Sequence, residues 1–209
     1  MRLKVLAAAM ALAALTVSSS AFAADPPNFD FNGYAIVPAS VGGQLVMRSV
    51  LTNNGVVPTP IALNFTLNQY TLVLVATLVS INGATGRHDY SPASVAMYED
   101  PIGGGTAANY ASPATFTDGT QILAGNFDGN LVRNRFTATL GNFVGKVDFV
   151  GGTRLGDLVT LQDWPFGGGW SRTISGIPAG YHENWDGKID LAVVAVTPSQ
   201  WGAVKNLYR

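Results

Sequence analysis

Short segments rich in Val, Leu, Ile, Thr, Phe and Tyr alternate along the chain with turns rich in Gly, Asn, Asp and Pro. This pattern is typical of all-β proteins, and helical periodicity is nearly absent. It predicts strands over residues 31–37, 45–52, 61–68, 71–80, 95–99, 115–117, 120–127, 133–140, 143–151, 158–162 and 189–196.

Two local patterns refine this picture. Residues 71–79 are apolar at both odd-numbered and even-numbered positions, which predicts a strand that is covered on both faces. Gly141-Asn142 is predicted to form the tight turn of a hairpin, and Asp186-Gly187 a type I′ turn, because Gly and Asx residues accept positive φ.

One helix is predicted, close to the C-terminus. Thr197 as N-cap, Pro198 at the first helical position and Gln200 three residues after the cap form a capping box. The fold class expected from the sequence is therefore all-β. We expect a single-domain antiparallel β-sandwich, with the jelly roll as a variant, that carries a short C-terminal helix.

The N-terminus has the three regions of a secretory signal peptide. Arg2 and Lys4 precede an apolar run over residues 5–17, and small residues lead to an Ala21-Phe22-Ala23 cleavage motif. We therefore expect a signal peptide over residues 1–23 that is cleaved near Ala23/Ala24, followed by one β-rich domain over residues 24–209. The protein is expected to be secreted or periplasmic.

Composition limits the classes of function. Charged residues make up 12% of the chain and cysteine is absent, so the core must hold the fold without disulfides. Without Arg2 and Lys4, 10 of the 12 Lys and Arg residues face 13 Asp and Glu residues, a net charge of −3. This argues against nucleic-acid binding, which depends on clustered cations. After residue 23 no apolar stretch reaches the roughly 18 to 20 residues of a transmembrane helix.

An aromatic-rich segment over residues 163–187 is the best candidate for a binding site, and we expect it to be a loop. Flat rings beside polar groups suit sugar recognition, since the rings cover the C–H face of a pyranose. The alternative is that these rings close the end of a β-sandwich core. The candidate ligand-binding residues are Trp164, Trp170, Tyr181 and Trp185.

Metal and catalytic sites have weaker support. Asp186 and Asp190 could supply oxygen ligands to Ca²⁺, although an Asx turn explains the same residues and no other cofactor is expected. No catalytic residue is assigned. A glycosidase pair would require the fold to bring together Glu99 and Glu183, the only two glutamates.

The sequence therefore indicates an exported, non-enzymatic binding or surface-interaction module that uses the four aromatic residues to bind carbohydrate. Its expected partner is a glycan or another component of the cell envelope. The main alternative is a structural, self-associating protein of the envelope or matrix. An outer-membrane β-barrel and a glycoside-acting enzyme have less support.

Overall fold

The computed structural model describes residues 26–53 and 57–191, which form nine β-strands and two short 3₁₀ turns. The predicted signal peptide over residues 1–23 and the predicted helix from Thr197 lie outside the described residues. The strands are β1 (Asn28–Ile36), β2 (Gln44–Thr52), β3 (Asn68–Asn82), β4 (Arg87–Pro101), β5 (Thr120–Phe127), β6 (Leu131–Arg135), β7 (Leu140–Gly151), β8 (Trp164–Ser171) and β9 (Glu183–Asp190).

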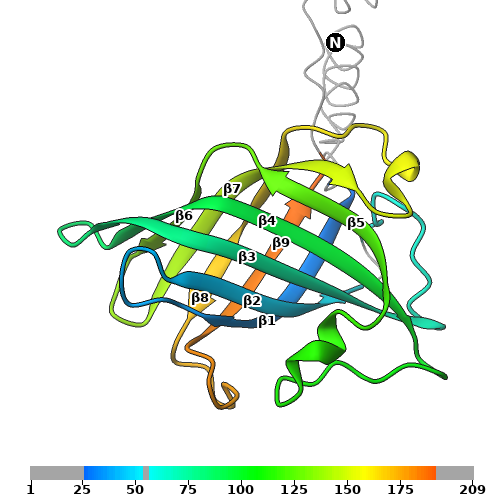
Figure 1. Cartoon of the computed structure of the whole chain (residues 1–209), viewed down its shortest axis with the longest axis horizontal. Helices are drawn as coiled ribbons and strands as arrows, with labels where there is room; N and C mark the ends of the chain where they lie inside the picture. Colours follow the sequence, from blue (N-terminus) through cyan, green and yellow to red (C-terminus); the bar gives the residue numbers. More distant parts are fainter. Residues whose placement is uncertain (1–25, 54–56, 192–209) are drawn as a thin grey trace, which may run out of the picture.

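The strands form a closed antiparallel barrel (Figure 1). Neighbours in sequence pair with each other around the wall, and β9 pairs with β1 from Asn28↔Asp190 to Ala35↔Glu183. β5 and β6 run in the same direction along β4, on either side of residues 128–130, and share one position in the wall. Eight positions therefore close the barrel, and the predicted open sandwich is wrong.

The difference arises in β8 and β9, which the sequence analysis assigned to a loop. Both strands alternate inward and outward residues, but glycine occupies the inward positions 168 and 187. A Cβ at Gly168 would overlap the carbonyl oxygen of Asp186 and the ring of Phe143, and one at Gly187 would meet Gly167 and the same ring. Alternation of small and large inward residues is characteristic of narrow barrels, and here it concealed the strand pattern.

Several other predictions are corrected. Gly141-Asn142 lies inside β7 and Asp186-Gly187 inside β9, and the β6–β7 turn is formed by residues 136–139. The ranges 61–68 and 158–162 are mainly loops, and 115–117 lies at the end of a 3₁₀ turn (Pro113–Phe116). In the described part of the chain, no helix is long and apolar enough to cross a membrane.

Aromatic side chains fill the barrel from one end to the other. Phe29 and Phe149 pack on Trp164, with ring centroids 6.1 and 5.3 Å away, and Phe143 stacks on Trp185 at 4.2 Å. Loop residues close the end at which β8 begins, where Ile61 is buried and Leu63, Phe65, Leu155 and Leu158 pack on the core.

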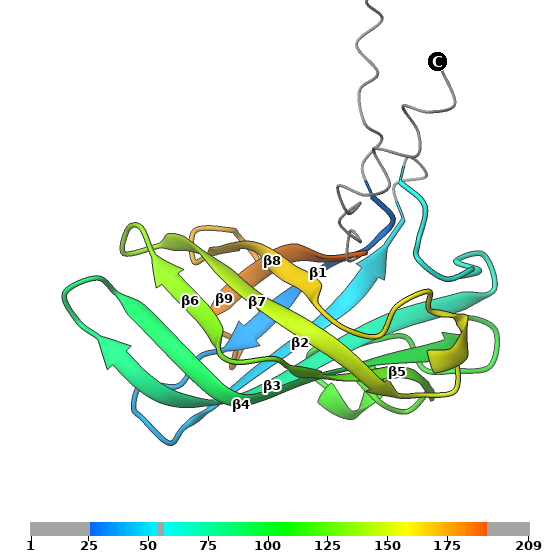
Figure 2. The same cartoon turned by 90° about the horizontal axis from the view of Figure 1, so that it is seen from above.

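The opposite end carries the β3–β4 and β6–β7 hairpins, which project together in Figure 2, and the β8–β9 loop over residues 172–182. We call it the hairpin end. It is the end at which β9 begins, with Glu183 as its first residue.

A matched pair of glycine substitutions tests the packing of β8. Gly168→Ala should lower the free energy of unfolding by about 3 kcal/mol, because its Cβ would overlap backbone and the Phe143 ring. Gly167→Ala should change it by less than about 1 kcal/mol, since a Cβ there comes no closer than 3.4 Å to any atom. Urea denaturation measures both, and equal destabilisation would contradict the assigned inward and outward positions.

Candidate functional site

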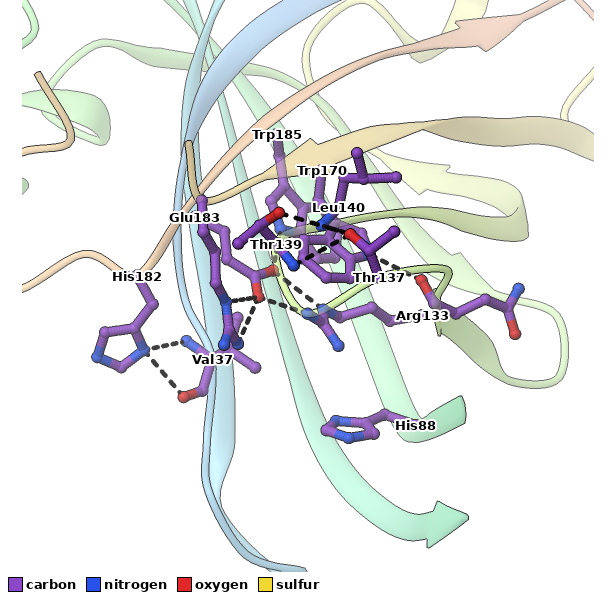
Figure 3. Close-up of polar contacts among 12 residues, drawn as sticks. Val37, His88, Arg133, Thr137, Thr139, Leu140, Trp170, His182, Glu183 and Trp185 are labelled. Atoms are coloured by element: carbon purple, nitrogen blue, oxygen red, sulfur yellow. Dashed lines mark hydrogen bonds and ion pairs between the residues drawn. The ribbon is translucent and has the colours of Figure 1, made fainter. Parts of the chain in front are cut away.

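A fully buried carboxylate lies at the hairpin end of the barrel. Glu183 is inward-facing at the start of β9, and its side chain is 0% exposed. It accepts a bidentate pair of hydrogen bonds from Arg133, whose Nε lies 3.0 Å from Oε2. Arg172 Nε donates to Oε1 at 2.9 Å. Trp185 Nε1 donates to Oε2 at 3.1 Å (Figure 3). Both carboxylate oxygens of Glu183 therefore accept several hydrogen bonds, from two charged guanidinium groups and one neutral indole.

Arg133 is buried as deeply as its partner. It projects inward from β6, and its guanidinium carbon lies 3.7 Å from the centroid of the Trp170 ring, a cation–π contact. The indole Nε1 of Trp170 donates to the backbone oxygen of Asn134 at 2.9 Å. The Trp170 ring, against which the Arg133 guanidinium packs, is thus itself held in place by a hydrogen bond.

A pocket of about 540 Å³ opens at this end. Its lining combines four apolar residues with one cation and two imidazoles. The Arg172 side chain is 45% exposed, so this residue joins the buried carboxylate to the open pocket. The lining residues are Val37, Pro38, Ala39, Ile81, His88, Arg172 and His182.

Both histidines of the chain line this pocket, although 94 positions separate them in sequence. His182 Nδ1 lies 3.0 Å from the backbone nitrogen and also 3.0 Å from the oxygen of Val37, which fixes the ring against β1. His88 Nδ1 lies 3.4 Å from the Tyr90 hydroxyl. Sequence analysis missed this grouping, because only the pairing of β1 with β9 and of β4 with β6 creates it.

Burial lowers the pKa of His88, and the positive charge of Arg133 lowers it further. Arg135 and Arg172 act in the same direction, and Glu183 opposes them. His88 is therefore neutral at pH 7. Since folding lowers this pKa, the unfolded chain takes up the proton first as the pH falls below about 6.5, so this group makes the fold less stable in acid.

The structure places the four predicted ligand-binding residues in two environments. Trp164, Trp170 and Trp185 lie inside the barrel, each at most 2% exposed. Tyr181 lies in the β8–β9 loop, where its ring contacts Tyr34 and Tyr110, and its hydroxyl accepts a hydrogen bond from Arg48 at 3.3 Å. These rings form no exposed row, and Trp170 and Trp185 instead contact the Arg133–Glu183 pair. Sugar binding by these residues stays a prediction.

The two predicted metal ligands lie on the outer face of β9. Lys188 is between them, and its Nζ lies 3.1 Å from Asp190 Oδ1. Among the described residues, no group of three His, Cys, Asp or Glu side chains is arranged to hold a metal ion. Calcium binding at Asp186 and Asp190 stays a prediction.

The conditional glycosidase pair does not form. Glu99 lies on β4, 11 residues beyond His88, and pairs with Tyr70 near the start of β3. At ~3.3 Å per residue this places it roughly 35 Å from the hairpin end, where Glu183 lies. This distance far exceeds the ~5–10 Å separation of catalytic carboxylates in glycosidases.

Comparison of the chain with protein-family models, with curated proteins and with solved structures finds no match.

A double-mutant cycle tests the buried ion pair. Glu183→Gln should reduce the free energy of unfolding by about 3–5 kcal/mol, because the Arg133 guanidinium would remain buried without a counter-charge. The double variant Arg133→Met/Glu183→Gln should lose less than the sum of the losses in the single variants Arg133→Met and Glu183→Gln. Additive losses in urea denaturation would show that the two side chains do not interact as described.

Proposed function

We propose that this chain is a small-molecule-binding barrel protein whose hairpin-end pocket takes an amphipathic organic anion. The observation that carries the proposal is the position of Arg172, half-exposed between a saturated buried carboxylate and an open pocket that four apolar residues also line. The expectation of an exported, non-enzymatic binding module belongs to the same proposal.

The charge at the hairpin end supports an anionic ligand. Arg133, Arg135 and Arg172 all act electrostatically on His88, and Glu183 is the acidic group that opposes them. These three cations and the one carboxylate together carry a net charge of +2. Arg172 contacts Oε1 of Glu183 through Nε and Nη2, so both N–H groups of Nη1 and the second N–H group of Nη2 are left for a ligand carboxylate, sulfonate or phosphate.

The pocket's size and walls support a ligand with an apolar body. A volume of about 540 Å³ lies within the range of small-molecule sites. Val37, Pro38, Ala39 and Ile81 provide contact for rings or alkyl groups beside the polar residues. The neutral His88 can donate or accept a hydrogen bond without adding charge.

A pair of fluorescent probes tests this proposal. Anilinonaphthalene sulfonate combines aromatic rings with an anion, and N-phenylnaphthylamine has the same rings without the charge. The protein should bind the sulfonate more tightly than the neutral probe. Arg172→Gln should raise the dissociation constant of the sulfonate about tenfold and leave that of the neutral probe unchanged. Fluorescence titration measures both dissociation constants.

Arg154→Gln is the matched control for this titration. Arg154 forms an exposed ion pair with Asp157 at 2.8 Å, away from the hairpin end, so its loss should leave sulfonate binding unchanged. An equal loss of affinity in both variants would mean that the sulfonate responds to overall charge rather than to the pocket, and the proposal would fail.

The lowered pKa of His88 predicts a pH dependence of binding. When His88 gains a proton in acid, below the ordinary histidine pKa of about 6.5, the pocket gains a positive charge, so the sulfonate should bind more tightly and the neutral probe should not. His88→Gln should abolish the increase. An increase of the same size in His88→Gln would contradict the assignment of this titration to His88.

A further inference from the structure

The outer face of β8 contains two glycines that the fold does not require. Gly167 and Gly169 point outward, in contrast to the inward Gly168 between them. A Cβ at Gly167 would lie 3.4 Å from the nearest atom and one at Gly169 3.8 Å, which are ordinary contacts, and neither residue has positive φ. Glycine weakens a strand, and its known uses in strands are bulges, tight bends and sites that a ligand approaches closely. The pairing of β8 with β7 and β9 is regular at both positions, which leaves the approach of a ligand.

The missing side chains leave a groove on the outer face of β8. In the strand register, Gly167 lies between Val144 and Lys188, and Gly169 between Asn142 and Asp186. At the end of β8 the groove meets a cavity of about 250 Å³, lined by Gly169, Trp170, Ser171, Ile174, Asn184 and Asp186.

A row of polar side chains crosses the groove at the level of Gly169. The strand register places Asn134, Asn142, Gly169, Asp186 and Asn32 side by side across β6, β7, β8, β9 and β1. Asn134 Nδ2 donates to Asn142 Oδ1 at 3.0 Å, which leaves the amide nitrogen of Asn142 and the amide oxygen of Asn134 for a ligand. Asp186 is exposed and forms no ion pair within the described part of the chain.

This set of groups matches hydroxyls rather than charged groups. Carboxamides both donate and accept hydrogen bonds, as hydroxyls do, and a carboxylate accepts from them. The nearest cation, Lys188, is paired with Asp190. Leu140, Val144 and Ile174 are 43–46% exposed beside the groove and provide apolar contact for C–H groups.

We infer that the outer groove along β8 binds a neutral, extended carbohydrate chain. The site is distinct from the hairpin-end pocket, since the two cavities share no lining residue. It uses the polar outer face of the two strands whose inward face holds Trp164, Trp170 and Trp185.

Retention on neutral polysaccharides tests the inference. The purified protein should be retained on at least one of cellulose, chitin, xylan or starch and on neutral oligosaccharides in an array. Gly169→Leu should fill the groove and weaken this binding by about tenfold or more without changing the unfolding midpoint, because the position has room for a Cβ. Asp186→Asn should weaken it by a smaller factor.

Ser94→Leu is the matched control. Ser94 is exposed on the outer face of β4, across the barrel from β8, so the same new side chain there should leave glycan binding unchanged. No retention on any neutral glycan, retention only on charged polymers, or equal binding by Gly169→Leu would each overturn the inference. Binding of the sulfonate probe should be the same in wild type and Gly169→Leu, which separates this site from the proposed pocket.

Discussion

The width of an eight-position barrel is the constraint on which the rest of this structure depends. Such a barrel has an interior just wide enough for side chains, so every inward position must match the rings across from it. Phe143 lies against Trp185 and leaves no room for a Cβ at positions 168 and 187. Glycines that resemble loop residues in the sequence thus lie where the largest rings of the core leave no room for a side chain.

The same constraint explains why the two ends of the barrel differ. At one end loop side chains such as Ile61 and Leu63 continue the apolar filling outward. At the hairpin end the filling stops at Trp185 and Trp170, and the next layer is the Arg133–Glu183 pair. A charge pair at this depth costs more desolvation than apolar residues of equal volume, so its presence favours a role in recognition over one in stability alone.

The local elements were largely predictable, and their assembly was not. The predicted strands at 45–52 and 120–127 agree with β2 and β5 almost residue for residue, because Val, Leu and Thr mark them. β8 was missed because glycine occupies half of its central positions, so its alternation of inward rings was not recognised. The same inward and outward alternation serves a sandwich and a barrel alike.

The candidate site could not be predicted for a related reason. Arg133 was expected in a strand, and Glu183 and His182 in an aromatic loop, but nothing local indicates that these residues meet. Their contact depends on which strands become neighbours around the wall, and the pairing of β1 with β9 joins residues about 150 positions apart.

That pairing also governs how the chain is exposed during synthesis. Every other strand finds its partner in the next segment to emerge, but the free edge of β1 has no partner until β9 has been made. Until β9 emerges, a nascent chain therefore carries two unpaired hydrogen-bonding edges and an uncovered aromatic lining, which are features that promote aggregation. β9 closes the barrel, and any delay in its synthesis extends this exposure.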